Sequence, residues 1–105
     1  VQAGNSISVT GTLGMDKEGN FPESAGDQTI LALETIEEAL NALGATVENV
    51  TRTRIYVKDI SLWEEIGRAH ATKFADILPA TTMVEVSGFA DPRGLIEIEA
   101  DAWVD

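Results

Sequence analysis

The alternation of apolar and polar residues between Pro79 and Val104 constrains the fold more than any other feature of the chain. A period of two places successive side chains on opposite faces, which is typical of half-buried strands. In the last run, one side carries Ile96, Ile98, Ala100 and Ala102, and the other side carries Glu97, Glu99, Asp101 and Trp103. The run before it sets Val84 and Val86 against Met83, Glu85 and Ser87. We therefore expect a sheet with one aliphatic face and one face rich in carboxylates.

Length and composition predict a single globular domain over residues 1–105, because 105 residues with 44% apolar content can build one core. No apolar run reaches the roughly 18 residues that a membrane-spanning helix needs. The start, VQAGNSIS, lacks the pattern of a signal peptide. The sequence has no cysteine, which removes disulfides and thiolate chemistry and fits the cytoplasmic location that we expect.

The charge argues against partners that are themselves anionic. Eighteen acidic residues against seven lysines and arginines give a formal net charge of −11. No basic cluster reverses this sign locally, so the chain repels phosphate backbones and anionic membranes. We expect neither a nucleic acid nor a membrane as a partner.

Apolar periodicity predicts two helices and two further strands. Residues 6–11 and 50–57 alternate and read as strands, with a loop between 11 and 24 that has its tip at Glu18-Gly19-Asn20. The first helix is expected from about 27 to 43, with a stripe formed by Ile30, Leu33, Ile36, Leu40 and Leu43. Ser24 with Asp27 is predicted to cap its start and Gly44 its end.

The second helix is predicted to begin at a capping box formed by Ser61 and Glu64 and to end at Pro79. Its inner side is expected to carry Trp63, Ile66, Ala69, His70, Phe74 and Ile77. The order strand, helix, strand, helix, strand, strand predicts an α+β fold with two helices on one face of a single mixed sheet. The uncovered face would hold Arg52, Arg54, Tyr56, Glu85, Glu97, Glu99 and Asp101.

The segment VTRTRIYVKDISLWEEIGRAHATKF, followed by PATTMVEVSGF and LIEIEADA, resembles the Rid family. These are YjgF-type reactive-intermediate deaminases, also labelled endoribonuclease L-PSP. The resemblance begins at ISVTGTLGMD and covers nearly the whole chain. It implies a chorismate-mutase-like fold and a homotrimer, in which uncovered sheet faces form a barrel-like core with small-molecule clefts between subunits. Members with the full motif hydrolyse enamines and imines to 2-keto acids and ammonia.

The resemblance also implies a set of site residues. Glu97 matches the glutamate that orients the attacking water, and Thr10-Gly11 matches a Ser-Gly pair. The family arginine that grips a substrate carboxylate is replaced by Thr81, and Gly67 stands where an asparagine is usual. The N-terminal loop that lends a tyrosine is missing, so the usual 2-imino acid deamination is expected to be weak or absent.

We therefore expect Glu97 to be catalytic in an intersubunit cleft that binds a carboxylic acid. Thr10, Gly11, Thr81 and Arg54 are the expected ligand-binding residues. Arg54 has two interpretations: it replaces the lost arginine, or it pairs, like Arg52, with Glu85, Glu97 or Glu99, which we favour. Glu97 is equally open to a role as a water-orienting base or as an ion-pair partner at the subunit interface.

No cofactor and no metal are expected. His70 is the only histidine, no zinc-binding motif is present, and His70 is interpreted as a packing residue before a general base. Three functions stay open: a hydrolase or deaminase of imine-like or amide-like molecules, a noncatalytic metabolite-binding or regulatory module, and an endoribonuclease or translation inhibitor. The charge argues against the third.

Overall fold

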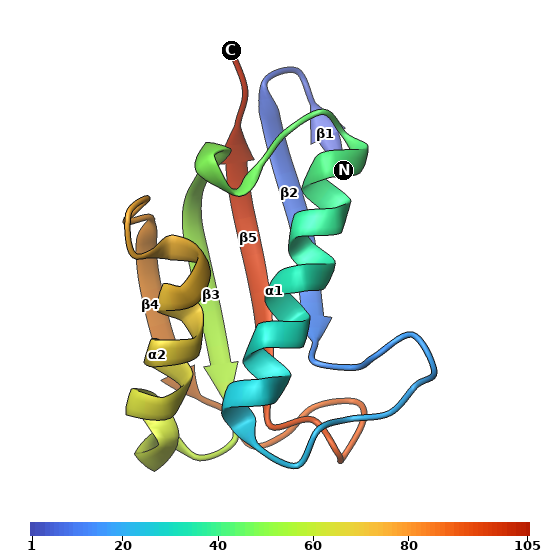
Figure 1. Cartoon of the computed structure of the whole chain (residues 1–105), viewed down its shortest axis with the longest axis vertical. Helices are drawn as coiled ribbons and strands as arrows, with labels where there is room; N and C mark the ends of the chain where they lie inside the picture. The colour runs from blue at the N-terminus through green and yellow to red at the C-terminus, as the bar shows by residue number, and fades with distance from the viewer.

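The computed structural model describes residues 1–105 as a five-stranded mixed sheet with two α-helices packed on one face (Figure 1). The strands are β1 Gln2–Ala3, β2 Ser6–Leu13, β3 Val50–Val57, β4 Ala80–Glu85 and β5 Ile96–Trp103. The helices are α1 Ala25–Ala42 and α2 Trp63–Phe74, with short 3-10 helices η1 Val47–Asn49 and η2 Ile60–Leu62. The predicted α+β class is confirmed, and the β1–β2 hairpin is an element that the pattern did not predict.

The sheet has the strand order β1-β2-β5-β3-β4, so the last strand of the chain lies at its centre. Strand β5 runs antiparallel to both β2 and β3, whereas β3 and β4 are parallel and are joined through α2. Along β5 buried and half-buried residues alternate, as the sequence predicts for a strand with one covered face. The neighbouring strands on both sides satisfy the backbone hydrogen bonds of β5 and fix which of its side chains face the helices.

The core lies between the sheet and the two helices. Leu33, Ile36 and Leu40 of α1 and Ile66 of α2 are at most 1% exposed, and they pack against buried residues of the sheet such as Ile98. Full burial of such a side chain contributes about 1.5–3 kcal/mol. The helices therefore hide the aliphatic face, and the opposite face of the sheet, which we call the open face, stays uncovered in the single chain.

Both ends of α1 follow local sequence signals. The Ser24 hydroxyl accepts a hydrogen bond from the Asp27 amide at 3.1 Å, so Ser24 caps a helix that begins two residues earlier than predicted. At the other end Gly44 adopts a φ of 80°, and the Ala45 amide donates to the Leu40 carbonyl. The last predicted stripe residue, Leu43, is 40% exposed because it already follows the end of the helix.

Three expectations for α2 were wrong. The cap is provided by Asp59, whose carboxylate accepts from the Ser61 amide and starts the 3-10 turn η2 instead. Trp63 is 56% exposed, because it lies in the first turn of the helix beyond the packed stripe. The helix ends at Phe74, five residues before Pro79, and the chain reverses through Leu78 with a φ of 54°.

The predicted face of β4 also needs correction. In the parallel register Met83 lies beside Ile55 and Glu85 beside Val57, so both belong to the helix-covered face. Met83 packs against the core, and the Glu85 carboxylate accepts a hydrogen bond from the Ile60 amide at 3.0 Å. Val84, in register with Tyr56, instead lies on the open face.

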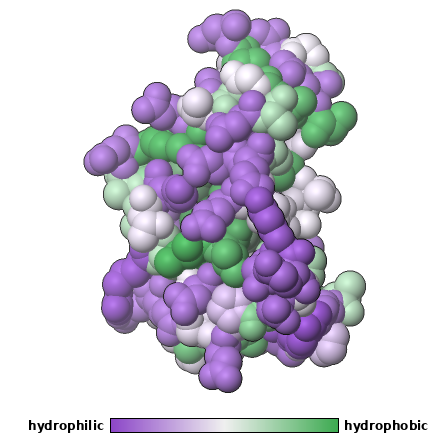
Figure 2. All heavy atoms as spheres, turned by 45° about the vertical axis from the view of Figure 1, so that its right-hand side comes forward, coloured by the Kyte–Doolittle hydropathy of each residue, from purple (hydrophilic) through white to green (hydrophobic).

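The surface in Figure 2 is mainly hydrophilic, with separate hydrophobic patches between polar side chains. This appearance fits a chain in which acidic residues far outnumber basic ones. Neither α1 nor α2 combines the length and the apolar character needed to cross a bilayer.

Candidate functional site

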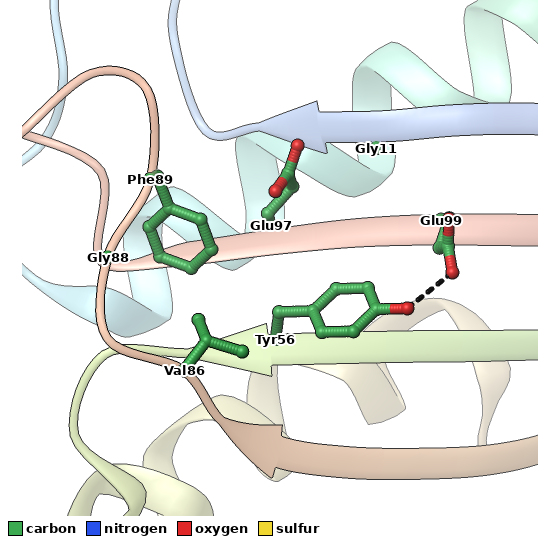
Figure 3. A pocket seen from close by; sticks show the side chains of 7 residues that line it. All are labelled: Gly11, Tyr56, Val86, Gly88, Phe89, Glu97 and Glu99. Carbon is green, nitrogen blue, oxygen red and sulfur yellow. Dashed lines mark hydrogen bonds between the residues drawn. The ribbon is translucent and has the colours of Figure 1, made fainter.

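A pocket of about 300 Å³ opens on the open face, near the end of the sheet where β2 and β3 finish and β5 starts (Figure 3). Its seven lining residues are Gly11, Tyr56, Val86, Gly88, Phe89, Glu97 and Glu99. They come from β2, β3, β5 and the segment that follows β4. The pocket therefore collects residues from four parts of the chain, and two of them, Glu97 and Glu99, carry carboxylates.

Glu97 is the central group of this pocket. Figure 3 shows its side chain lying toward Gly11 of β2, with the rings of Phe89 and Tyr56 on the other side. A Cβ at position 11 would overlap the Glu97 carboxylate, so glycine is what allows β2 and this side chain to approach so closely. Glu97 is half-buried and makes no hydrogen bond or ion pair with the rest of the chain. Glu97 therefore has no ionic partner within its own chain, and its role as an ion-pair partner at a subunit interface stays a prediction.

A network of polar contacts links four side chains on the open face, and two of them, Tyr56 and Glu99, line the pocket. The Tyr56 hydroxyl donates to the Glu99 carboxylate at 2.5 Å, and Arg54 lies 3.0 Å from Asp101 and 3.8 Å from Glu99. The hydrogen bond to Glu99 raises the pKa of Tyr56, because ionising the phenol would break this bond and place two negative charges together. Tyr56 therefore remains a protonated hydroxyl at neutral pH.

The loop between β4 and β5 is held at both ends. The Val86 amide donates to the Val57 carbonyl at 2.8 Å, which continues the β3–β4 pairing. At the far end the buried side chain of Gln28 donates to the Arg93 carbonyl and accepts from the Leu95 amide. These contacts anchor the segment that carries Gly88 and Phe89 into the pocket.

A turn within this loop is stabilised by a carboxylate and a guanidinium. Asp91 accepts hydrogen bonds from the Arg93 amide, Nε and Nη2, and these bonds lower its pKa to about 2. The Arg93 guanidinium also stacks on the Phe21 ring at 4.7 Å. Arg93 is therefore committed to the loop and does not reach into the pocket.

Thr81 lies on the opposite face of the sheet from Glu97. In register with Thr53, its hydroxyl lies 2.9 Å from the Thr53 hydroxyl, which is itself 2.9 Å from His70 Nε2. Thr81 also donates to the Pro79 carbonyl at 3.1 Å, so Thr53 donates to Thr81 and His70 Nε2 donates to Thr53. Burial lowers the pKa of His70, which keeps the ring neutral in this chain of hydrogen bonds.

The structure thus brings together two of the five expected site residues, Glu97 and Gly11. Thr10 lies at the irregularity in the β2–β5 register next to Gly11 but does not line the pocket. Arg54 points to the open face, where Asp101 and Glu99 engage it, and it is not a lining residue either. Thr81 is separated from Glu97 by the sheet.

Sequence reasoning missed Tyr56, Phe89 and Glu99 as site residues. Tyr56 could have been found, because it follows Arg54 at the strand period and so shares the face of Glu97. Phe89 lies in a loop, where no periodicity indicates direction. No group of three or more His, Asp or Glu side chains is placed to hold a metal ion.

Fold and site together place the chain in a known class. The Endoribonuclease L-PSP family model matches residues 1–104, and the chain belongs to this family, which includes the YjgF and RidA proteins. The structure is similar to Rv2704 of Mycobacterium tuberculosis, described as a member of the YjgF/YER057c/UK114 family. That match has a TM-score of 0.90 and 46% identity, and it covers 98% of this chain and 82% of that one.

Two further relatives support the same assignment. The chain is 35% identical to the uncharacterized protein SCO2049 of Streptomyces coelicolor, over 98% of this chain and 78% of that protein. The YjgF gene product of E. coli has a TM-score of 0.93 at 27% identity, with 100% of this chain and 85% of that chain covered. The single mixed sheet with two helices on one face is therefore the fold of this family.

Proposed function

We propose that this protein is a small-molecule hydrolase that acts on a carbon–nitrogen double bond in the Glu97 pocket. The observation that carries the proposal is the Glu97 carboxylate, which is unpaired, half-buried and directed into a pocket walled by Tyr56 and Phe89. A carboxylate with these properties is free to accept a proton from a bound water. The resemblance to imine-hydrolysing members of the family suggests the class of reaction, which is hydrolysis of a carbon–nitrogen double bond.

In the proposed reaction Glu97 takes a proton from water while the water oxygen bonds to the imine carbon. The electron pair of the C=N bond moves to nitrogen, which takes up this proton from Glu97, so that the carbon carries a hydroxyl and an amino group. Glu97 then accepts the hydroxyl proton as the C=O bond forms and passes it to the nitrogen, which leaves as ammonia. Arg54 supports this chemistry from a distance, because it holds Glu99 and thereby the Tyr56 hydroxyl.

We further propose that three copies assemble through their open faces, so that the cleft lies between subunits. Two apolar side chains on this face are exposed in the single chain, Trp103 at 55% and Val84 at 43%. Because Thr81 lies behind the sheet from Glu97, a ligand touching both would need Thr81 from a neighbouring copy. Such a cleft is the place where Thr10 and Thr81 would contact a ligand.

The test is the release of ammonia from a panel of imines by the wild-type protein and by the Glu97→Gln variant. Loss of a positioned general base predicts a fall in turnover of about 10²–10⁴-fold. The Glu23→Gln variant is the matched control, because it removes the same charge at an exposed loop position and should leave turnover unchanged. Equal turnover by Glu97→Gln and wild type would refute the role of Glu97, and a wild-type protein inactive on the whole panel would favour a noncatalytic binding module.

A further inference from the structure

The charges around the Glu97 pocket are opposite to those that a carboxylic acid ligand requires. The ionisable lining residues are Glu97, Glu99 and the protonated Tyr56, and no lysine, arginine or histidine lines the pocket. Two glutamates on the same face of one strand repel a ligand carboxylate and attract a cation. The substrate class expected from the sequence therefore disagrees with the site that the structure builds.

The neighbouring cations do not correct this balance. Arg54 is engaged by Asp101 and Glu99, at 3.0 and 3.8 Å. Lys58 donates to the Pro92 carbonyl at 3.2 Å, and Arg93 is held by Asp91. Withdrawing Arg54 to bind a ligand would leave Asp101 and Glu99 without a positively charged partner.

Hydrogen-bond polarity points the same way. The hydrogen of the Tyr56 hydroxyl is used by Glu99, so Tyr56 offers a ligand only an acceptor. The carboxylates of Glu97 and Glu99 are acceptors as well. Every polar side chain that one copy contributes to the pocket therefore requires a donor from the ligand, and an N–H group of a cation is the donor that a carboxylate binds most strongly.

The remaining walls suit a flat organic cation. The Phe89 ring and the Tyr56 ring lie on the side of the carboxylate away from Gly11, with Val86 near them in Figure 3. Aromatic faces attract cations through their quadrupoles, and their apolar surface packs against a planar group. A volume of about 300 Å³ accommodates a small molecule of this kind.

From these observations we infer that the pocket selects small cationic, N–H-rich ligands, such as amidinium, iminium or ammonium compounds, in preference to carboxylic acids. This inference rests on the proposal that the Glu97 pocket is the functional site. It makes the substrate an iminium or amidine-like compound that does not depend on a carboxylate anchor, and it assigns to Glu97 a binding contact in addition to its proton transfer.

Benzamidine and benzoate provide a matched test, because the two ions share ring and size and differ in charge. Binding to the intact assembled protein is followed by amide chemical shifts in NMR spectra, with Gly11, Gly88 and Phe89 as reporters of the pocket. Benzoate is a fair competitor, since the backbone amides of Gly88 and Phe89 make no hydrogen bond within the chain and are available to an anion.

We expect benzamidine to shift the reporter amides, and its affinity to fall at least about tenfold in Glu97→Gln and to weaken as salt is raised. The Glu23→Gln control should bind like wild type. Binding of benzoate to the pocket as tightly as benzamidine, or no benzamidine binding at the reporters, would overturn the inference. Benzamidine binding without any imine turnover would instead refute the proposed reaction, while the inferred preference for cationic ligands would remain supported.

Discussion

The residue at position 81 affects which ligand groups the proposed cleft can bind. The Thr81 hydroxyl already donates to the Pro79 carbonyl and accepts from Thr53, so it has one free acceptor position left. A ligand from a neighbouring copy would have to bring a donor to it. Thr81 thus agrees with the acceptor-rich Glu97 pocket and with a ligand that supplies N–H groups.

The buried histidine gives a prediction for pH dependence. Burial lowers the pKa of His70 below 6.5, so the unfolded chain binds a proton more readily than the folded protein. The free energy of unfolding should therefore be highest above about pH 6.5, and it should fall as the pH drops from there toward the folded pKa. Urea denaturation between pH 7.5 and 5, together with NMR titration of the ring, measures both quantities.

His70 is the only histidine, which isolates its effect in this pH window. The His70→Gln variant keeps an N–H donor for Thr53 and should lose the pH dependence between about 6.5 and 5. A folded-state pKa at or above 6.5 would contradict the buried, neutral ring.

At the scale of elements, two glycines with open space around them predict opposite effects of the same change. Gly44 has a φ of 80° after α1, and Gly67 lies inside α2 with no positive φ; an added Cβ meets nothing within 4 Å at either position. Gly44→Ala should destabilise the protein by about 1–2 kcal/mol, because alanine is strained in the left-handed region. Gly67→Ala should stabilise it by about 0.5–1 kcal/mol through helix propensity.

Thermal unfolding of the two variants beside wild type provides the measurement. Each serves as the control of the other, since both add one methyl group to a position without steric conflict. Equal shifts of the two melting temperatures in one direction would show that the backbone conformations assigned here are wrong.

The elements differ in how far the sequence could predict them. Strand β3 matches its prediction at both ends, because its β-branched residues alternate without ambiguity between Val50 and Val57. The face of β4 could not be read in this way, since apolar residues occupy both sides of the run at Met83, Val84 and Val86. Only the parallel register with β3 decides which side faces the helices.

The site was predictable where it lies on a regular strand. Glu97 follows from the alternation of β5 together with the family resemblance, whereas Phe89 comes from a loop whose path is set by distant contacts to Gln28. The partners of Arg54 were also not predictable in detail. Its pairing with carboxylates was favoured, but the closest partner is Asp101, a residue absent from the expected set.

For the molecule as a whole, charge and exposed surface limit what can cover the open face. A net charge of −11 argues against RNA as the occupant, although the family carries the name of an endoribonuclease. Copies of the same chain suit this face better, because it carries both positive and negative side chains. The positive ones are Arg52 and Arg54, and the negative ones are Glu97, Glu99 and Asp101. The face also carries the exposed apolar side chain of Trp103. A repeated, self-complementary surface of this kind favours a closed symmetric assembly.

The molar mass of the folded protein in solution, measured by light scattering after size exclusion, tests this assembly most directly. We predict three times the 11.2 kDa of one chain, with the open faces of the copies buried against each other and a Glu97 pocket at each seam. A stable, folded particle with the mass of a single chain would contradict the account, because the open face would then be exposed to solvent and no cleft between subunits would exist.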